Sequence, residues 1–216
     1  MAFVITSEDY TKYLAAAEKK LVDNKDYVTE LDLATGDGDH WSNMNMGFKK
    51  LIENSDKLAE LNISDEFKEI GKIMMSVIGG SSGVLYGSAY IGAAKASKGM
   101  EELDRDGLYA VLKAMLEAIM DRGQAKPGFK TMIDSLYPAV VEYGKCLDEN
   151  VSDEKLCERV KTAAIDGANS TADMEAVKGR ATYQADKGVG HLDPGAVTMS
   201  YQISVLMDTA KEKILA

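Results

Sequence analysis

Three aspartates lie very close together in one stretch of the sequence. Asp32, Asp37 and Asp39 fall within eight residues, with glycines between them that permit tight turns. Carboxylates at this spacing repel one another unless a cation lies between them. Hard oxygen ligands without a cysteine favour Mg²⁺ or Ca²⁺ over Zn²⁺, and no glutamate closes an EF-hand loop here. The spacing therefore predicts a divalent metal site, with a solvated acidic turn or helix-capping aspartates as the alternative.

Potential partners for an anionic ligand follow this acidic stretch. His40 and Asn43 offer neutral donors beside the predicted metal, although a lone loop histidine is otherwise a surface residue. Residues 79–96 begin with glycines around Ser81 and Ser82 and then become helical. The unpaired N–H groups at such a helix start attract phosphate. The segment is not a Walker A loop, because no Gly-Lys-Ser/Thr closes it.

Two later segments also combine turn residues with possible ligand contacts. In residues 122–140, Gly123 is interpreted as a helix C-cap signal. In residues 178–197, Arg180 is a permanent, fork-shaped cation suited to phosphate oxygens. Pro194 is well placed as the first residue of the last helix. Taken singly, each feature is as readily a surface turn as a binding site.

Helical patterns dominate the elements that must position these residues. A capping-box pattern at 6–9 precedes apolar residues at helical spacing, and a short helix is predicted from about Lys25. Ser64 and Ser152 are predicted N-caps. No stretch alternates apolar and polar residues well enough for a strand. We predict one all-α domain over residues 1–216 with about eight or nine helices, the longer ones at roughly 43–60, 64–78, 82–98, 107–122, 131–149, 153–174 and 194–214.

The predicted breaks between helices contain most of the polar residues singled out above. They fall at 34–42, 79–87, 123–130 and 179–195. Successive antiparallel helices place alternate loops at the same end of a bundle. We therefore expect these four segments to meet in one site at one end of the bundle.

The composition of the whole chain limits its partners. The 216 residues carry a net charge of -10, which disfavours nucleic acids and anionic membranes. No apolar run approaches the roughly 20 residues of a membrane span, and the N-terminus lacks the features of a signal peptide. Cys146 and Cys157 are interpreted as buried thiols in a reducing compartment. A cytoplasmic protein is therefore expected.

Four blocks of the sequence together resemble the dihydroxyacetone kinase L subunits, the nucleotide-binding subunits known as DhaL. They occur in the family's order, and the resemblance covers essentially the whole chain. It implies an antiparallel barrel of eight helices with a nucleotide at one open end. The blocks are LDLATGDGDHWSNMNMGF, GGSSGVLYGS, GQAKPGFKTMIDSLYPA and KGRATYQADKGVGHLDPGA.

The resemblance also implies roles for individual residues. Asp32, Asp37 and Asp39 would bind two Mg²⁺ ions that bridge the phosphates of ADP or ATP. Arg180 would be the catalytic residue, stabilising the charge on the γ-phosphoryl group as it moves. The implied nucleotide contacts, from the phosphates to the adenine and ribose, are His40, Asn43, Ser81, Ser82, Gly123, Met132, Arg180, Asp193, Pro194 and Gly195.

The family's activity supplies the predicted function. In bacterial phosphotransferase-linked systems, the L subunit keeps its ADP, and a multiphosphoryl carrier subunit (M) rephosphorylates that ADP in place. The ATP then phosphorylates dihydroxyacetone that is held covalently on a separate K subunit. Two alternatives stay open: an ATP-exchanging subunit for dihydroxyacetone or another small ketose, and a non-catalytic nucleotide-sensing module that engages a transcription regulator. A homodimer also stays open.

The sequence departs from the family pattern at two aromatic residues. Trp41 replaces the glycine of the usual Asp-His-Gly, and Phe129 stands where the family usually has aspartate. Near the end, QADKGV replaces the usual LGERSI. A bulky residue at position 41 is expected to cover the phosphate site or to face a partner. These changes bear on partner and sugar more than on nucleotide binding.

Overall fold

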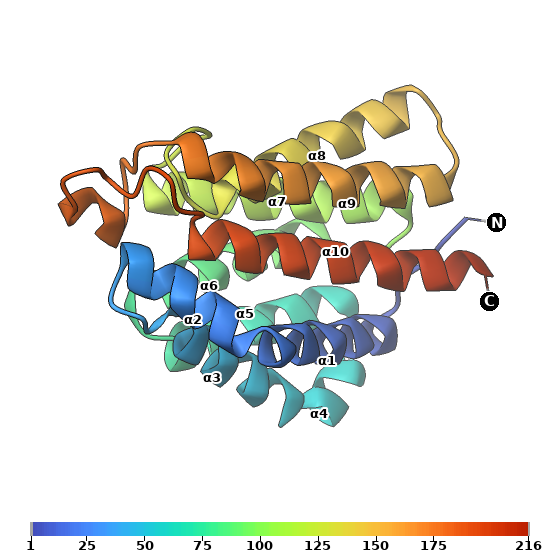
Figure 1. The fold of residues 1–216 in the computed structure, drawn as a ribbon. Helices are drawn as coiled ribbons and strands as arrows, with labels where there is room; N and C mark the ends of the chain where they lie inside the picture. Colours follow the sequence, from blue (N-terminus) through green and yellow to red (C-terminus); the bar gives the residue numbers. More distant parts are fainter. Residues whose placement is uncertain (1, 216) are drawn as a thin grey trace.

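Helices account for the regular structure of residues 2–215, which the computed structural model describes (Figure 1). Within these residues the only β feature is one isolated bridge, between Ile5 and Leu103. The all-α prediction is therefore confirmed. The helices are α1 (Ser7–Asp23), α2 (Lys25–Thr35), α3 (His40–Ile52), α4 (Ser55–Ala59), α5 (Ile63–Val77), α6 (Gly80–Ala96), α7 (Arg105–Gly123), α8 (Ile133–Asp148), α9 (Asp153–Ser170) and α10 (Pro194–Leu215), with the 3₁₀ helices η1 (Thr171–Asp173) and η2 (Arg180–Tyr183).

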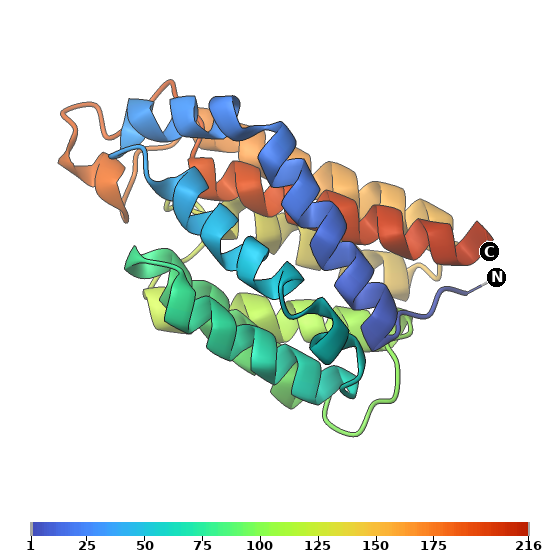
Figure 2. The same ribbon diagram turned by 90° about the horizontal axis from the view of Figure 1, so that it is seen from below.

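The longer helices pack against one another in a continuous order. Each contacts the next in the series α1, α3, α5, α6, α7, α8, α9 and α10, and α10 packs against α1. The shorter helices attach to this arrangement, α2 against α3 and α10, and α4 against α1 and α5. Figure 2 shows the same helices from below, with α1 crossing α3 and α10. Long, nearly parallel axes therefore leave the connecting segments at the two ends of the bundle.

Apolar side chains from most of the helices fill the interior of the bundle. Tyr10 of α1, Phe67 of α5 and Tyr90 of α6 form an aromatic cluster, with the ring centroids of Tyr10 and Phe67 4.7 Å apart. Cys146 and Cys157 are buried free thiols, as predicted. None of the described helices combines the length and apolarity that a membrane span requires.

The observed helix ends confirm two predicted caps and correct two others. Thr6 forms the predicted capping box, and Ser152 caps α9. The prediction for Ser64 is wrong, because Asn62 caps α5 and the Ser64 hydroxyl donates to the Ala94 carbonyl at 2.7 Å. Gly123 is the last residue of α7 rather than its cap.

The C-cap of α7 is instead Gln124, whose φ of 46° lies in the left-handed region. One long helix predicted over 43–60 also proves wrong, since α3 and α4 are separate. Asn54 lies between them, with φ of -111° and ψ of 11°. Its side chain donates to the Lys50 carbonyl at 2.8 Å, a local bond that competes with helix continuation.

One end of the bundle carries the long segment between α9 and α10. Residues 174–193 project there, beside the turn between α2 and α3 (Figure 1). The Gln184 side chain donates to the Ala34 carbonyl of α2 at 2.8 Å, which joins these two parts of the chain. The end of α10 and the start of α1 lie at the opposite end of the bundle.

Candidate functional site

A pocket of about 630 Å³ opens at the end of the bundle that carries residues 174–193. That volume is of the size that holds a drug-sized or nucleotide-sized ligand. All four predicted polar segments contribute to its walls, as expected from the arrangement of the helices. The lining includes every residue that the sequence put forward: Asp32, Asp37, Asp39, His40, Asn43, Ser81, Ser82, Gly123, Met132, Arg180, Asp193, Pro194 and Gly195.

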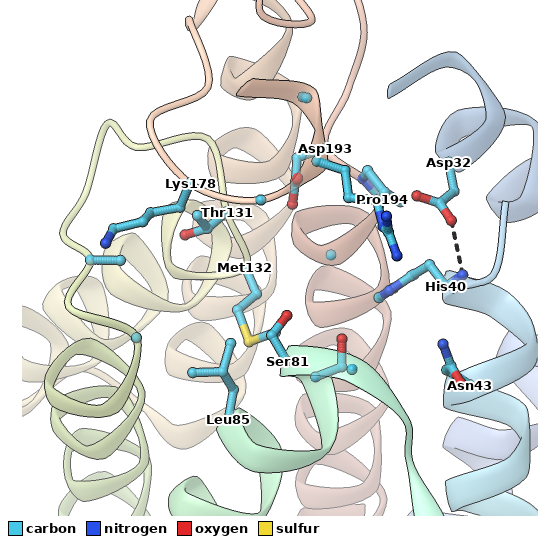
Figure 3. A pocket seen from close by; sticks show the side chains of 18 of the residues that line it. Asp32, His40, Asn43, Ser81, Leu85, Thr131, Met132, Lys178, Asp193 and Pro194 are labelled. Atoms are coloured by element: carbon cyan, nitrogen blue, oxygen red, sulfur yellow. Dashed lines mark hydrogen bonds between the residues drawn. The ribbon is translucent and has the colours of Figure 1, made fainter. Parts of the chain in front are cut away.

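The acidic corner of the pocket consists of Asp32, Asp37 and Asp39. Each offers an oxygen atom, and these oxygens lie within 4.8 Å of one another. Asp32 is buried and accepts the His40 backbone N–H at 2.9 Å, which fixes its carboxylate at the start of α3 (Figure 3). A Cβ at Gly36 would lie 2.5 Å from the Asp32 Oδ1 atom. Glycine at position 36 therefore permits the turn to close over Asp32.

These donors fit a hard divalent cation. Magnesium binds oxygen at about 2.1 Å, so oxygens on opposite sides of one ion are about 4.2 Å apart. The oxygens of the three carboxylates lie within 4.8 Å of one another, and the side chains of Asp37 and Asp39 are exposed, so a small rotation brings them to this spacing. Three carboxylates do not fill the coordination shell of Mg²⁺. The remaining positions are left to water or phosphate, as Mg²⁺ prefers.

Arg180 lies at the same corner. Its Nη2 atom is 2.6 Å from the Asp37 Oδ2 atom, and the arginine side chain is 63% exposed. This exposure makes the ion pair weak, since solvent screens exposed pairs. The ion pair matters for its location, because it places the five N–H donors of the Arg180 guanidinium beside the carboxylate oxygens that suit a metal.

Four helices begin at the pocket. The first residues of α3, α6, α8 and α10 all contribute to the lining. Gly79 caps α6 without a side-chain hydrogen bond, and Gly80 has φ of 65°, a conformation that favours glycine. Helix N-termini carry partial positive charge and unpaired N–H groups. The pocket therefore favours an anionic ligand despite the acidic net charge of the chain.

His40 connects the start of α3 to α10. The ring is buried, and its Nε2 atom lies 2.9 Å from the Thr198 hydroxyl. The hydroxyl also lies 3.2 Å from the Gly195 carbonyl, to which it donates in the tautomer that carries a proton on His40 Nε2. Burial lowers the pKa of His40 below its usual range, against the opposing effect of Asp32, so the ring is neutral. The contact between His40 Nε2 and Thr198 joins the start of α3 to α10.

Asp193 caps the last helix. Its Oδ2 atom accepts the Ala196 backbone N–H at 2.7 Å, and its own N–H donates to the Thr171 hydroxyl at 2.9 Å. Burial raises the pKa of Asp193 to about 7, while the Ala196 bond and the Lys130 ammonium favour the charged form. Pro194 starts α10, as predicted.

The structure adds residues that the sequence did not identify. Leu85 joins the predicted Met132 in an apolar side of the pocket, across from Asp32 and His40 (Figure 3). The buried Asp134 accepts the Thr131 N–H at 2.7 Å and shapes the turn before α8. Lys130, Arg122 and Lys178 bring positive charge to the lining. Leu85, Lys130 and Thr131 all lie inside quoted blocks, and that position was the signal in the sequence that could have identified them.

Trp41 packs against the first two helices instead of lying over the pocket. Its Nε1–H donates to the Leu21 carbonyl at 3.0 Å, and the Lys25 ammonium lies 4.9 Å from the ring centroid. Trp41 is not among the residues that line the pocket. A covering role at the phosphate site is therefore not supported by its position.

A Trp41→Gly variant is expected to lose about 2–3 kcal/mol in free energy of unfolding. Lost packing and the helix cost of glycine both contribute. Nucleotide affinity should change less than about threefold. Urea denaturation and calorimetric titration measure the two effects, with Ser42→Gly, the exposed neighbour in the same turn, as the control for glycine itself. A large loss of affinity at unchanged stability would contradict this structural role.

An all-helical fold whose helix N-termini surround one pocket beside an acidic corner defines a class: helical proteins built to hold an anionic ligand. Comparison with known proteins narrows the class. The DAK2 domain family matches residues 34–208, and the chain belongs to this family.

Its relatives include stand-alone subunits of similar length. The chain is 36% identical to the PEP-dependent dihydroxyacetone kinase, ADP-binding subunit DhaL of Escherichia coli (strain K12), over 87% of this chain and 89% of the relative. It is 34% identical to the PTS-dependent counterpart of Lactococcus lactis, over 95% of this chain and 98% of the relative.

A solved structure shares the fold. The crystal structure of the dihydroxyacetone kinase from C. freundii in complex with AMP-PNP and Mg²⁺ matches with a TM-score of 0.71 and 25% identity. The match covers 92% of this chain but 33% of that protein, so the chain spans about a third of the solved kinase.

Proposed function

We propose that this chain, as one domain over residues 1–216, is the ADP-binding L subunit of a phosphoenolpyruvate-dependent dihydroxyacetone kinase. The observation that carries the proposal is the meeting of three carboxylates with four helix N-termini in one pocket. Relatives named as ADP-binding subunits match it along nearly their full length. The chain corresponds to about a third of the C. freundii dihydroxyacetone kinase.

The pocket divides by chemistry into a phosphate side and a base side. The N-terminus of α6 with Ser81 and Ser82 offers donors to phosphate oxygens. Leu85 and Met132 offer an apolar surface for the flat base. Gly123 lies close to Leu85, since a Cβ there would be 3.2 Å from its Cδ2 atom. A side chain at Gly123 would therefore narrow the space proposed for the adenine.

Asp32, Asp37 and Asp39 would hold two Mg²⁺ ions between the carboxylates and the phosphates. Bound there, magnesium would supply positive charge against the phosphate oxygens. The residues of the chain do the positioning. Asp32 is held by the His40 N–H, and the exposed aspartates follow the ligand.

Arg180 is proposed as the catalytic residue. Its guanidinium lies at the edge of the acidic corner, where the terminal phosphoryl group would leave the nucleotide. A fixed cation aimed at developing charge lowers the barrier to transfer. No nucleophile–base pair is needed on this chain, because the nucleotide itself carries the phosphoryl group.

The acceptor must approach at the open end of the pocket. Exposed apolar side chains are present there: Tyr183, which ends η2, is 89% exposed, and Leu33 of α2 is 63% exposed. Leu33 lies against the acidic turn, since a Cβ at Gly38 would be 2.6 Å from its Cδ2 atom. We propose that this rim meets a K subunit that carries dihydroxyacetone and, in turn, an M carrier subunit. The buried free thiols accord with the proposed cytoplasmic location.

Mass spectrometry after acid extraction tests the proposal directly. The desalted protein is expected to carry ADP in nearly stoichiometric amount, and to transfer phosphate to dihydroxyacetone when K and M subunits and phosphoenolpyruvate are supplied. Rapid loss of ADP, with transfer supported by free ATP, would favour the ATP-exchanging kinase instead. Bound nucleotide that never transfers phosphate would favour a sensing module that engages a transcription regulator. A protein that binds no nucleotide would refute all three.

A further inference from the structure

A lysine ammonium is buried beneath the loop that carries Arg180. Lys130 lies in the turn before α8 and is 2% exposed. Its Nζ atom donates to the backbone carbonyls of Thr171 and His191, both at 2.5 Å. These residues are the two ends of the segment between α9 and Asp193. One ammonium group therefore joins the two ends of the loop at its base.

Other hydrogen bonds also hold the loop. The Asp193 N–H donates to the Thr171 hydroxyl at 2.9 Å, and the Val177 N–H donates to the Phe129 carbonyl at 3.2 Å. The Gly190 N–H donates to the Ala172 carbonyl at 2.8 Å, beside the lysine. At the tip, Gln184 contacts α2, and Arg180 contacts Asp37. The loop is thus held at its base, at Val177 and at its tip, where Arg180 lies. Loss of the Lys130 bonds at the base would let the arginine shift relative to the phosphates.

Burial makes the lysine a strong constraint. A buried ammonium must satisfy its donors, because leaving them unpaired is costly. Two donors of Lys130 are satisfied by backbone carbonyls, and Asp193 and Asp134 supply compensating negative charge. An exposed lysine could exchange these bonds for water, but this one cannot. The carbonyls must therefore stay in place as long as the lysine does.

We infer that Lys130 is a positioning residue for phosphoryl transfer, which holds the base of the 171–191 loop so that Arg180 stays at the acidic corner. The inference rests on the proposed function. Lys130 need not contact the phosphates, because it acts through the loop. Removal of its side chain should move Arg180 and leave the acidic corner unchanged.

Hydrogen–deuterium exchange of the purified protein tests the structural step without any activity. In a Lys130→Met variant, amides of residues 174–190 are expected to exchange at least about tenfold faster, because the loop opens more often. Lys187→Met is the matched control. Lys187 belongs to the same loop and also has positive φ, 50° against 59° at Lys130, but its ion pair with Glu175 is exposed. His191→Ala is a second control, since only its carbonyl is used.

A double-mutant cycle with Arg180→Gln tests the functional step. Lys130→Met alone should lower kcat about 10- to 100-fold, the cost of a small misplacement. In the Arg180→Gln background, the same substitution should lower kcat less than about threefold further. Equal losses in both backgrounds, or unchanged exchange of 174–190, would overturn the inference. If Lys130→Met does not fold, Lys130→Arg and Lys130→Gln decide: arginine should restore slow exchange and kcat, and glutamine should not.

The same data separate this inference from the proposed function. A parent protein that binds no nucleotide and transfers no phosphate would refute the proposed function, and with it the catalytic part of the inference. The exchange experiment would still show whether Lys130 holds the loop. Normal transfer by the parent, with Lys130→Met equal to it in kcat and exchange, would refute the inference alone.

Discussion

An Asp39→Asn variant is expected to lose about 100-fold or more of its magnesium-dependent affinity for ADP, and to unfold at the same temperature as the parent. The neutral amide removes one of the three charges that would hold the metal. The fold does not depend on the charge, because the Asp39 side chain is exposed and does not cap α3. Removing it also relieves repulsion from Asp32 and Asp37.

Calorimetric titration of ADP into nucleotide-free protein measures this effect, with Mg²⁺ and again with a chelator. The parent should bind far more tightly with Mg²⁺, whereas the variant should bind about equally under both conditions. Asp56→Asn, which makes the same change on the exposed face of α4, should behave as the parent does. Full Mg²⁺ dependence in Asp39→Asn would show that this carboxylate is not a ligand and that the acidic corner works differently.

The acidic corner was accessible from the sequence because its residues are close in the chain. Asp32 lies in the last turn of α2, and Asp37 and Asp39 lie in the short loop that follows, so local spacing alone predicts that their oxygens converge. The meeting of the four polar segments was also predictable, because helix length and polarity fix which loops share an end. The turn residues of these segments that line the pocket, such as Gly123 and Gly195, were identified for the same reason.

Contacts across long sequence distances were not accessible in this way. Lys130 bonds to carbonyls at Thr171 and His191, which are 41 and 61 residues away. A lysine in a polar turn is usually exposed, and nothing local indicates that this one is buried. Trp41 shows the same limit, because its hydrogen bond to Leu21 depends on how α1 and α3 cross.

The predicted helix boundaries were wrong where the hydrogen bond of one side chain determines where a helix begins or ends. The interruption between α3 and α4 lies at Asn54, whose amide bonds back to the Lys50 carbonyl. The start of α5 is set by Asn62 rather than Ser64, because the Ser64 hydroxyl is used by the neighbouring α6. Periodicity cannot rank such caps, since several polar residues near a helix start compete on nearly equal terms.

A second strong effect is expected far from the pocket, at Glu66 in α5. The residue is fully buried, and within the described residues neither carboxyl oxygen has a hydrogen-bond partner. The surroundings are aromatic: Tyr10 of α1 and Tyr90 of α6 both lie near enough to feel its charge. Burial raises the pKa of Glu66 from 4.5 to about 8, against the opposing effect of the nearby Ser7 side chain. The carboxyl is therefore protonated and neutral near pH 7.

The stability of the protein should fall as pH rises through this window. The unfolded chain releases the proton near pH 4.5, whereas the folded protein keeps it until about pH 8. Between these values the folded state binds more protons, so increasing pH favours unfolding. The loss of stability is complete above pH 8, where the folded protein must either bury the charged carboxylate or keep it protonated at a pH above its pKa.

A Glu66→Gln variant should remove this dependence. Glutamine keeps the shape of the protonated side chain and cannot ionise, so the variant should match the parent near pH 4 and exceed it at pH 9 by up to about 4 kcal/mol. Urea denaturation at several pH values measures the difference, with the exposed Glu60→Gln as the control. Parallel stability curves for parent and variant would show that Glu66 is ionised in the folded core. Because Glu66 lies outside the pocket lining, ADP affinity should stay unchanged, which separates this effect from any damage to the site.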